Sequence, residues 1–133
     1  MNSEANSLRL VTESSEESGR ERRSQWVREH YDRVAPNRDK WISRNAYFHE
    51  EDSRFTRFLV PPGLKILDLG CGTGHLLENL NPSEGVGIDI SPKMIDVARR
   101  NYPPERHPNL NFEVGDIENP ETLGALEGPF DII

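Results

Sequence analysis

The sequence lacks the features that would place it in an oxidising or a membrane environment. Cys71 is its only cysteine, which excludes an internal disulfide and a cysteine metal cluster. No apolar run is long enough to cross a bilayer, and the first residues lack the basic and then apolar order of a signal peptide. We therefore expect a cytoplasmic protein that does not act at a membrane.

Patterns for metal binding and for nucleophilic catalysis are missing as well. The four histidines show neither H-E-x-x-H nor H-x-x-x-H spacing, so no metal site is predicted. Cys71 has no histidine at a spacing typical of a cysteine nucleophile. The chain is thus not expected to form a covalent intermediate.

Apolar residues are scarce, at 34% of 133 residues, which fits one domain with some unstructured sequence attached. The net charge is −7, and the acidic excess lies in residues 61–133, which hold twelve acidic and five basic side chains. A surface of that sign repels phosphate backbones. No nucleic-acid partner is therefore expected, and the oligomeric state cannot be inferred from these numbers.

The N-terminal part divides into a tail and a helical segment. Residues 1–22 are rich in Ser, Glu and Asn, and we expect a disordered tail because they can bury too little surface to offset the entropy of ordering. Residues 23–60 carry helical stripes. One stripe, which contains Val27 and Tyr31, is predicted to end before Pro36, and a second runs from Trp41 to Leu59.

From residue 61 onwards, short apolar runs alternate with helix-like segments. Strands are predicted at Lys65–Leu69, Gly85–Asp89, Leu110–Val114 and Phe130–Ile133, and helices at about 74–80, 92–101 and 120–126. Ser91 and Asn119 each precede a proline, which is typical of an N-cap followed by the first helical residue. The alternation implies an α/β fold with a doubly wound parallel sheet. Because the last strand ends the sequence, we expect the N-terminal half of such a sheet.

A glycine-rich loop follows the first predicted strand. Gly70, Gly72 and Gly74 form G-x-G-x-G, whereas the dinucleotide fingerprint needs a further glycine where His75 stands. Glycine can take positive φ and lets a ligand approach the main chain, and the helix that follows directs unpaired N–H groups at negative charge. The loop therefore predicts a small-molecule site, of a nucleoside type, and disfavours NAD and FAD.

Two aspartates follow the next two predicted strands. Asp89 ends the second strand, where a carboxylate can accept hydrogen bonds from both hydroxyls of a ribose. Asp116 follows the third strand and can accept a hydrogen bond from an exocyclic amine such as that of adenine. Asp116 also suits a helix or turn cap, and Asp68, before the glycines, suits a structural partner of loop N–H groups.

The segments Leu67–Gly74, Asp89–Ser91 and Gly115–Asp116 resemble, in order and spacing, the three cofactor motifs of class I, Rossmann-like S-adenosylmethionine-dependent methyltransferases of the small-molecule type. The resemblance covers residues 61–133. It implies an enzyme that transfers a methyl group from S-adenosyl-L-methionine to a small-molecule acceptor. The cofactor-binding residues that it implies are Asp68, Gly70, Cys71, Gly72, Gly74, Asp89, Ile90, Met94, Asp116 and Ile117.

The resemblance also suggests roles within the site. Asp68 and the glycines would hold the methionine moiety, Asp89 the ribose and Asp116 the adenine. Met94 and its neighbour Ile95 equally suit a core face of their helix. Residues 31–36 resemble, more loosely, a helix that many members place over the cofactor, and this makes His30 and Tyr31 lid candidates. No catalytic residue is implied.

Two alternatives to a complete methyltransferase remain open. The chain can be a noncatalytic S-adenosylmethionine-binding module or an inactive fragment, and a nucleotide-dependent oxidoreductase or epimerase is a further alternative. Seven-stranded members of the family build the acceptor pocket largely from the loop after strand four and from later strands. The resemblance therefore implies that these 133 residues alone transfer little or no methyl group.

Overall fold

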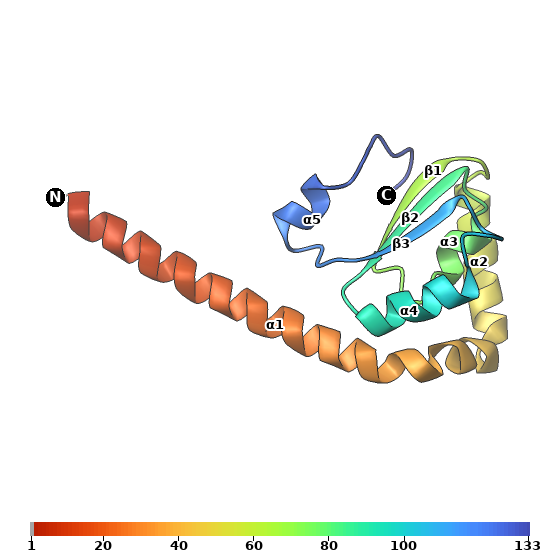
Figure 1. Ribbon diagram of the computed structural model, residues 1–133, viewed down its shortest axis with the longest axis horizontal. Helices are drawn as coiled ribbons and strands as arrows, with labels where there is room; N and C mark the ends of the chain where they lie inside the picture. The colour runs from red at the N-terminus through yellow and green to blue at the C-terminus, as the bar shows by residue number, and fades with distance from the viewer. Residues whose placement is uncertain (1) are drawn as a thin grey trace.

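The computed structural model describes residues 2–133, with side chains from residue 15 onwards. Two helices, α1 (Asn2–Arg44) and α2 (Ala46–Leu59), precede the strands. Figure 1 shows α1 as a long rod whose C-terminal part runs beside α4, while its N-terminal part extends away from the rest of the protein. No helix within residues 2–133 has both the length and the apolar character needed to span a bilayer.

The remaining elements alternate along the chain. They are β1 (Lys65–Leu69), α3 (His75–Asn79), β2 (Glu84–Asp89), α4 (Pro92–Asn101), β3 (Leu110–Val114) and α5 (Pro120–Gly124). The three strands are parallel and lie in the order β1-β2-β3. The predicted α/β class and its first three strands are therefore confirmed. The strands can be parallel because each connection is long enough to return the chain to the start of the next strand.

The fourth predicted strand, Phe130–Ile133, is reduced to a single bridge. Ile132 pairs in parallel with Ile66 at the free edge of β1, and its carbonyl accepts a hydrogen bond of 3.0 Å from the Leu67 N–H. Pairing stays short because the Asp131 carboxylate, instead of a backbone carbonyl, accepts the Lys65 N–H at 2.8 Å. The chain nevertheless occupies the fourth-strand position of a doubly wound sheet.

The core lies between the sheet and the helices α3 and α4. Its buried members are Ile66, Cys71, Leu77, Leu80, Ile95, Ala98, Leu110 and Phe112. Figure 1 shows α5 and the chain end away from α3 and α4, across the sheet. On that side, a Cβ added to Gly115 would lie 2.6 Å from the Thr122 side chain, so this glycine allows α5 to pack closely.

The N-terminal part of α1 differs from the expectation of a disordered tail. The helix continues back to Asn2, and only Met1 lies outside the described residues. Residues 15–22 are exposed except for Gly19, which is half-buried, so backbone hydrogen bonds rather than packing hold this part of the helix. Residues 15–22 bury little surface, as the composition predicts, and yet they are helical.

Helix α1 also passes through Pro36, where the sequence predicted its end. Tertiary contacts on both sides of the proline explain this difference. Asp32 accepts a hydrogen bond of 2.5 Å from the Ser91 hydroxyl, and Asp39 accepts one of 2.8 Å from the Asn101 side chain. These contacts tie α1 to both ends of α4, and they offset the helix hydrogen bond that proline removes.

Helix α2 turns its polar side towards the protein and its apolar side outwards. Ser53 is its buried residue, and the helix begins after a break at Asn45. The outward side chains Tyr47, Phe48, Phe55, Phe58 and Leu59 are 59% to 84% exposed. The apolar stripe predicted between Trp41 and Leu59 is therefore present on α2, but no described element covers it.

Ser91 both caps α4 and links it to α1. Its Oγ accepts a hydrogen bond of 3.1 Å from the Met94 N–H and donates one to Asp32. We expect Ser91→Ala to lower the free energy of unfolding by about 2 kcal/mol, because the cap and the partner of Asp32 are lost together. Urea unfolding measures this change.

Asn119→Ala is the matched control, because Asn119 caps the exposed helix α5 through a hydrogen bond of 3.0 Å from the Glu121 N–H. Its loss should cost about 0.5 to 1 kcal/mol. Equal losses for the two variants would show that the contact between Ser91 and Asp32 adds nothing to an ordinary cap.

Candidate functional site

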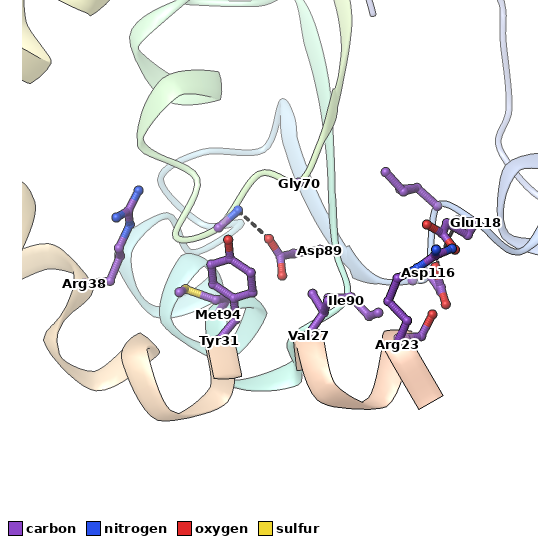
Figure 2. A pocket seen from close by; sticks show the side chains of 14 residues that line it. Arg23, Val27, Tyr31, Arg38, Gly70, Asp89, Ile90, Met94, Asp116 and Glu118 are labelled. Atoms are coloured by element: carbon purple, nitrogen blue, oxygen red, sulfur yellow. Dashed lines mark hydrogen bonds and ion pairs between the residues drawn. The ribbon is translucent and has the colours of Figure 1, made fainter. Parts of the chain in front are cut away.

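A cavity of about 390 Å³ lies at the carboxyl ends of the strands and is covered by α1. Its lining residues are Arg23, Ser24, Val27, Tyr31, Arg38, Gly70, Gly72, Asp89, Ile90, Met94, Gly115, Asp116, Ile117 and Glu118. Figure 2 shows Arg38 at one end, Asp116 at the other, and Asp89 between them. The glycine loop and the two predicted aspartates therefore border one cavity, which we call the first cavity.

The glycines of the loop have different surroundings. Gly70 and Gly72 have φ of +86° and +53°, and a Cβ added to either would meet nothing within 4 Å. The space above them is open to a ligand, as the sequence predicted. Gly74 has φ of +81°, but its Cβ would lie 2.7 Å from the Phe112 ring, so it packs against the core and does not line the cavity.

Most N–H groups of the loop are bound within the protein. Those of Gly70 and Cys71 both donate to the Ile88 carbonyl, at 2.8 and 3.0 Å, and that of Gly74 donates to the Cys71 carbonyl at 2.9 Å. The Gly72 N–H is bound to a carboxylate. The N–H groups of Gly70, Cys71 and Gly72 therefore fix the loop to β2 instead of facing the cavity.

That carboxylate belongs to Asp89, which is 9% exposed. Its Oδ2 accepts the Gly72 N–H and its Oδ1 accepts the Ser91 N–H, both at 2.9 Å. Each carboxylate oxygen has a further lone pair. Asp89 is thus held rigidly at the cavity wall and retains acceptor capacity for two donors from a ligand.

Asp116 lies at the other end of the cavity and also holds a turn. Its Oδ1 accepts the Glu118 N–H at 2.9 Å, as expected of a turn cap. Burial acts to raise the pKa of Asp116, but hydrogen bonds from Ser24 and Glu118, together with the charges of Arg28 and Arg20, hold it below its ordinary value. The carboxylate therefore remains ionised at the cavity.

Apolar side chains form the walls between the two aspartates. Ile90 and Ile117 follow β2 and β3, Met94 belongs to α4, and Val27 and Tyr31 come from α1. Met94 is only 1% exposed, so it serves the core and the cavity wall together. Between the two aspartates, the arrangement provides a slot with apolar faces, which suits a flat ring such as a purine.

A second cavity, of about 310 Å³, lies on the other side of the glycine loop between α1, α2 and α3. Its lining residues are Arg38, Ile42, His49, Asp52, Ser53, Thr56, Asp68, Gly70, Cys71, Gly72, Thr73, His75 and Leu76. The two cavities share Arg38, Gly70 and Gly72. The predicted site residues Asp68 and Cys71 therefore belong to the second cavity.

The Cys71 thiol is not activated in this cavity. Burial, followed by the Asp68 and Asp89 carboxylates, raises the pKa of the Cys71 thiol above its ordinary value. A protonated thiol is a poor nucleophile. Its Sγ is buried beside Gly87, where a Cβ would lie 2.8 Å away, so the small side chain serves packing.

The pKa of Asp68 is raised to about 6 by burial and, secondarily, by the Asp89 charge. The folded protein then holds this proton more tightly than the unfolded chain does, so the contribution of Asp68 to stability falls as pH rises from about 4 to about 6. Asp68→Asn removes this loss. We expect the stability of Asp68→Asn relative to the natural protein to increase by about 2 kcal/mol across that range.

Urea unfolding of both proteins at several pH values measures this difference, and the other carboxylates cancel in the comparison. A difference in stability that does not change with pH would mean that Asp68 titrates in the folded protein as it does in the unfolded chain.

The sequence did not indicate the residues that α1 adds to the first cavity, except for Tyr31. Arg23 and Ser24 lie one helical turn before Val27, so the stripe was a usable signal for them, whereas Arg38 lies beyond Pro36, where the sequence predicted the helix to end. The lid candidate His30 is exposed and stacks on Trp26, with ring centroids 5.7 Å apart, and it does not line the cavity.

Comparison with known proteins adds to this geometry. A family model described as "Methyltransferase domain" matches residues 61–133. The chain is 39% identical over 67 residues to magnesium-protoporphyrin O-methyltransferase of Rhodobacter capsulatus, a match that covers 49% of this chain and 30% of that protein. It is 42% identical over 72 residues to malonyl-[acyl-carrier protein] O-methyltransferase of Halalkalibacterium halodurans, covering 51% and 26%. The chain thus spans less than a third of the length of these relatives.

A solved structure shares the fold over a longer range. The crystal structure of magnesium protoporphyrin IX methyltransferase from Synechocystis, with bound S-adenosylmethionine, superposes with a TM-score of 0.61. The match covers 82% of this chain and 59% of that one, at 22% identity. It therefore extends beyond the part matched by the family model and includes N-terminal residues.

Proposed function

Because the chain belongs to the methyltransferase-domain family, we propose that its first cavity binds S-adenosyl-L-methionine and that the protein transfers the methyl group to a small-molecule acceptor. The observation that carries the proposal is the meeting of the glycine loop, Asp89 and Asp116 at one cavity of about 390 Å³. A relative named for magnesium-protoporphyrin, 39% identical over 67 residues, supports an acceptor of the small-molecule class.

The residues present fit the cofactor at each of its parts. The free lone pairs of Asp89 suit the two ribose hydroxyls. Asp116, with Ile117, Ile90 and Met94, suits the amine and the faces of adenine. The open space at the glycines suits the sulfonium end, which leads to Asp68 in the second cavity. Gly74 and Cys71 do not line the first cavity. They hold the glycine loop in place, because Gly74 packs against Phe112 and Cys71 packs against Gly87.

The cofactor supplies an activated methyl group on a sulfonium, so the chain needs no nucleophile of its own. Its residues bind and orient instead. Asp89 holds the ribose end at a fixed point of the loop, and Val27 and Tyr31 cover the cavity from α1 and exclude water. The protonated Cys71 thiol is consistent with direct transfer, without an enzyme-bound methyl group.

Isothermal titration calorimetry with S-adenosylhomocysteine and with NAD tests this proposal. We expect saturable binding of S-adenosylhomocysteine to one site per chain and no heat with NAD. Binding of NAD alone would instead favour the oxidoreductase alternative. An absence of heat with both ligands, for a folded sample, would overturn the proposed cofactor site.

A further inference from the structure

The outward side of α2 is an apolar surface that no described element covers. It consists of Tyr47, Phe48, Phe55, Phe58 and Leu59, all of them exposed, and we call it the α2 face. Figure 1 shows α2 at the margin of the protein, beyond α3. Because a whole aromatic side chain has about 150 to 250 Å² of surface, the α2 face presents roughly 700 Å² to solvent. A contiguous apolar patch of this size is rare on a monomer and marks an interaction site.

The area of the α2 face matches the requirement of a dimer. Each partner of a stable interface contributes about 800 Å². An interface across a two-fold axis uses the same patch on both copies, so one patch of this size is sufficient. The aromatic residues that make up most of the α2 face are also the type that contributes most to binding at the centre of interfaces.

The charged residues of α2 are arranged for an antiparallel pair. Residues 50–52 are acidic and lie before the middle of α2, whereas Arg54 and Arg57 lie after it. When two copies of α2 run antiparallel and are centred on each other, Glu51 of each copy lies opposite Arg54 of the other. Since Glu51 and Arg54 form an ion pair of 3.6 Å within one chain, two copies bring together four charges of alternating sign. Complementary charges of this kind fix direction and register.

The apolar side chains fit the same arrangement. Tyr47 and Phe58 lie at equal distances from the two ends of α2, so the antiparallel pair sets Tyr47 of one copy opposite Phe58 of the other. Both lie on the same side of the helix as Glu51, because residues four and seven positions apart share a face. A parallel pair would instead place like charges opposite each other.

A lipid surface fits the α2 face less well. Helices that lie on a membrane carry many Lys and Arg side chains on their polar side, whereas α2 has three acidic residues, two arginines and no lysine. The chain as a whole has a net charge of −7. Anionic lipids repel such a surface.

We propose that two copies of this chain associate through the α2 face, with their α2 helices antiparallel. The association goes beyond the proposed function and does not depend on it. On the opposite side of α2, His49, Ser53 and Thr56 line the second cavity. The second copy therefore leaves that cavity free and supports the helix that forms one of its walls.

Sedimentation equilibrium of the chain tests the proposal. We expect a monomer–dimer equilibrium with a dissociation constant in the micromolar range. Phe55→Glu combined with Phe58→Glu should raise this constant by at least about 100-fold, because two central aromatic contacts are lost in each copy. Trp26→Glu is the matched control, because Trp26 is an aromatic residue of α1 outside the α2 face and is similarly exposed, at 63% against 65% for Phe55. It should leave the constant unchanged.

Charge exchange tests the antiparallel arrangement. Glu51→Arg and Arg54→Glu should each weaken the association of the variant with itself, because each places like charges opposite each other. An equimolar mixture of the two variants should form dimers again, since two arginines of one copy then face two glutamates of the other. Circular dichroism verifies that every variant is folded.

Three results would overturn the proposal. They are a natural chain that stays monomeric at a concentration of about 100 µM, well above a micromolar dissociation constant, a dimer that the paired phenylalanine substitution leaves intact, and a mixture of charge variants that stays monomeric. Vesicles of phosphatidylcholine and phosphatidylserine examine the other occupant. If the monomeric chain binds them and the paired phenylalanine substitution abolishes this binding, the α2 face is a lipid-binding surface instead.

Discussion

Asp89→Asn is expected to weaken the binding of S-adenosylhomocysteine by at least about 100-fold. The carboxylate is 9% exposed and already accepts the Gly72 and Ser91 N–H groups. Asparagine has one acceptor oxygen, so its NH₂ group must face one of these two donors. The variant therefore loses the charge that we propose accepts the ribose hydroxyls, and it also disturbs the loop beside this position. Isothermal titration calorimetry measures the loss.

Asp96→Asn provides the matched control, because Asp96 is an exposed aspartate of α4 that lines neither cavity. It has the same change in net charge and should bind the ligand as the natural protein does. If Asp89→Asn binds within a few-fold of that value, the ribose does not lie at Asp89 and the proposed orientation of the cofactor is wrong.

Gly74→Ala is expected to lower the free energy of unfolding by about 3 kcal/mol. Part of this loss, about 1 kcal/mol, comes from a positive φ of +81° that alanine adopts with strain. The rest comes from a Cβ placed 2.7 Å from the Phe112 ring, in a core that has little space to adjust. Urea unfolding followed by circular dichroism measures the change.

Gly70→Ala separates the two causes, because Gly70 has a similar φ of +86° but open space at its Cβ position. We expect it to lose only about 1 kcal/mol of stability. Equal losses at the two positions would show that the Phe112 ring moves aside at no cost and that Gly74 is required for its backbone conformation alone.

The sequence predicted the sheet well because local signals agreed with one another. The bounds of β1, β3 and α4 match the prediction, and β2 begins one residue earlier. At α4, Ser91 caps the helix directly before a proline, so the start of the helix is specified locally. The fourth strand was longer in the prediction, because an apolar run does not show that the Asp131 side chain takes part in the pairing.

The N-terminal helices were predicted less well, for a physical reason. Whether a helix continues through Pro36 depends on contacts that Asp32 and Asp39 make with α4, about 60 residues further along the chain. Propensity and periodicity describe only near neighbours. The same long-range contacts place α1 over the first cavity. Sequence motifs therefore do not predict that Arg38 of α1 lines this cavity.

The topology of the α/β part accounts for which of its residues line the first cavity. Parallel strands bring their carboxyl ends to one edge of the sheet, so Asp89 and Asp116, which follow two of these strands, lie near the glycine loop. They line the same cavity, as do Ile90, Met94 and Ile117. The sequence did not show that Asp68 faces a second cavity, because this depends on where α2 packs.

The central claim, that the first cavity is the cofactor site, is tested most directly by a titration of the ¹⁵N-labelled protein with S-adenosylhomocysteine, followed by amide chemical shifts. We predict saturable shifts at Gly72, Ile90 and Ile117, which border the first cavity. Ser83 and Asn109, near the opposite ends of the strands, should not shift. Shifts concentrated at that opposite end, or no shifts at saturating ligand, would contradict the assignment of this cavity.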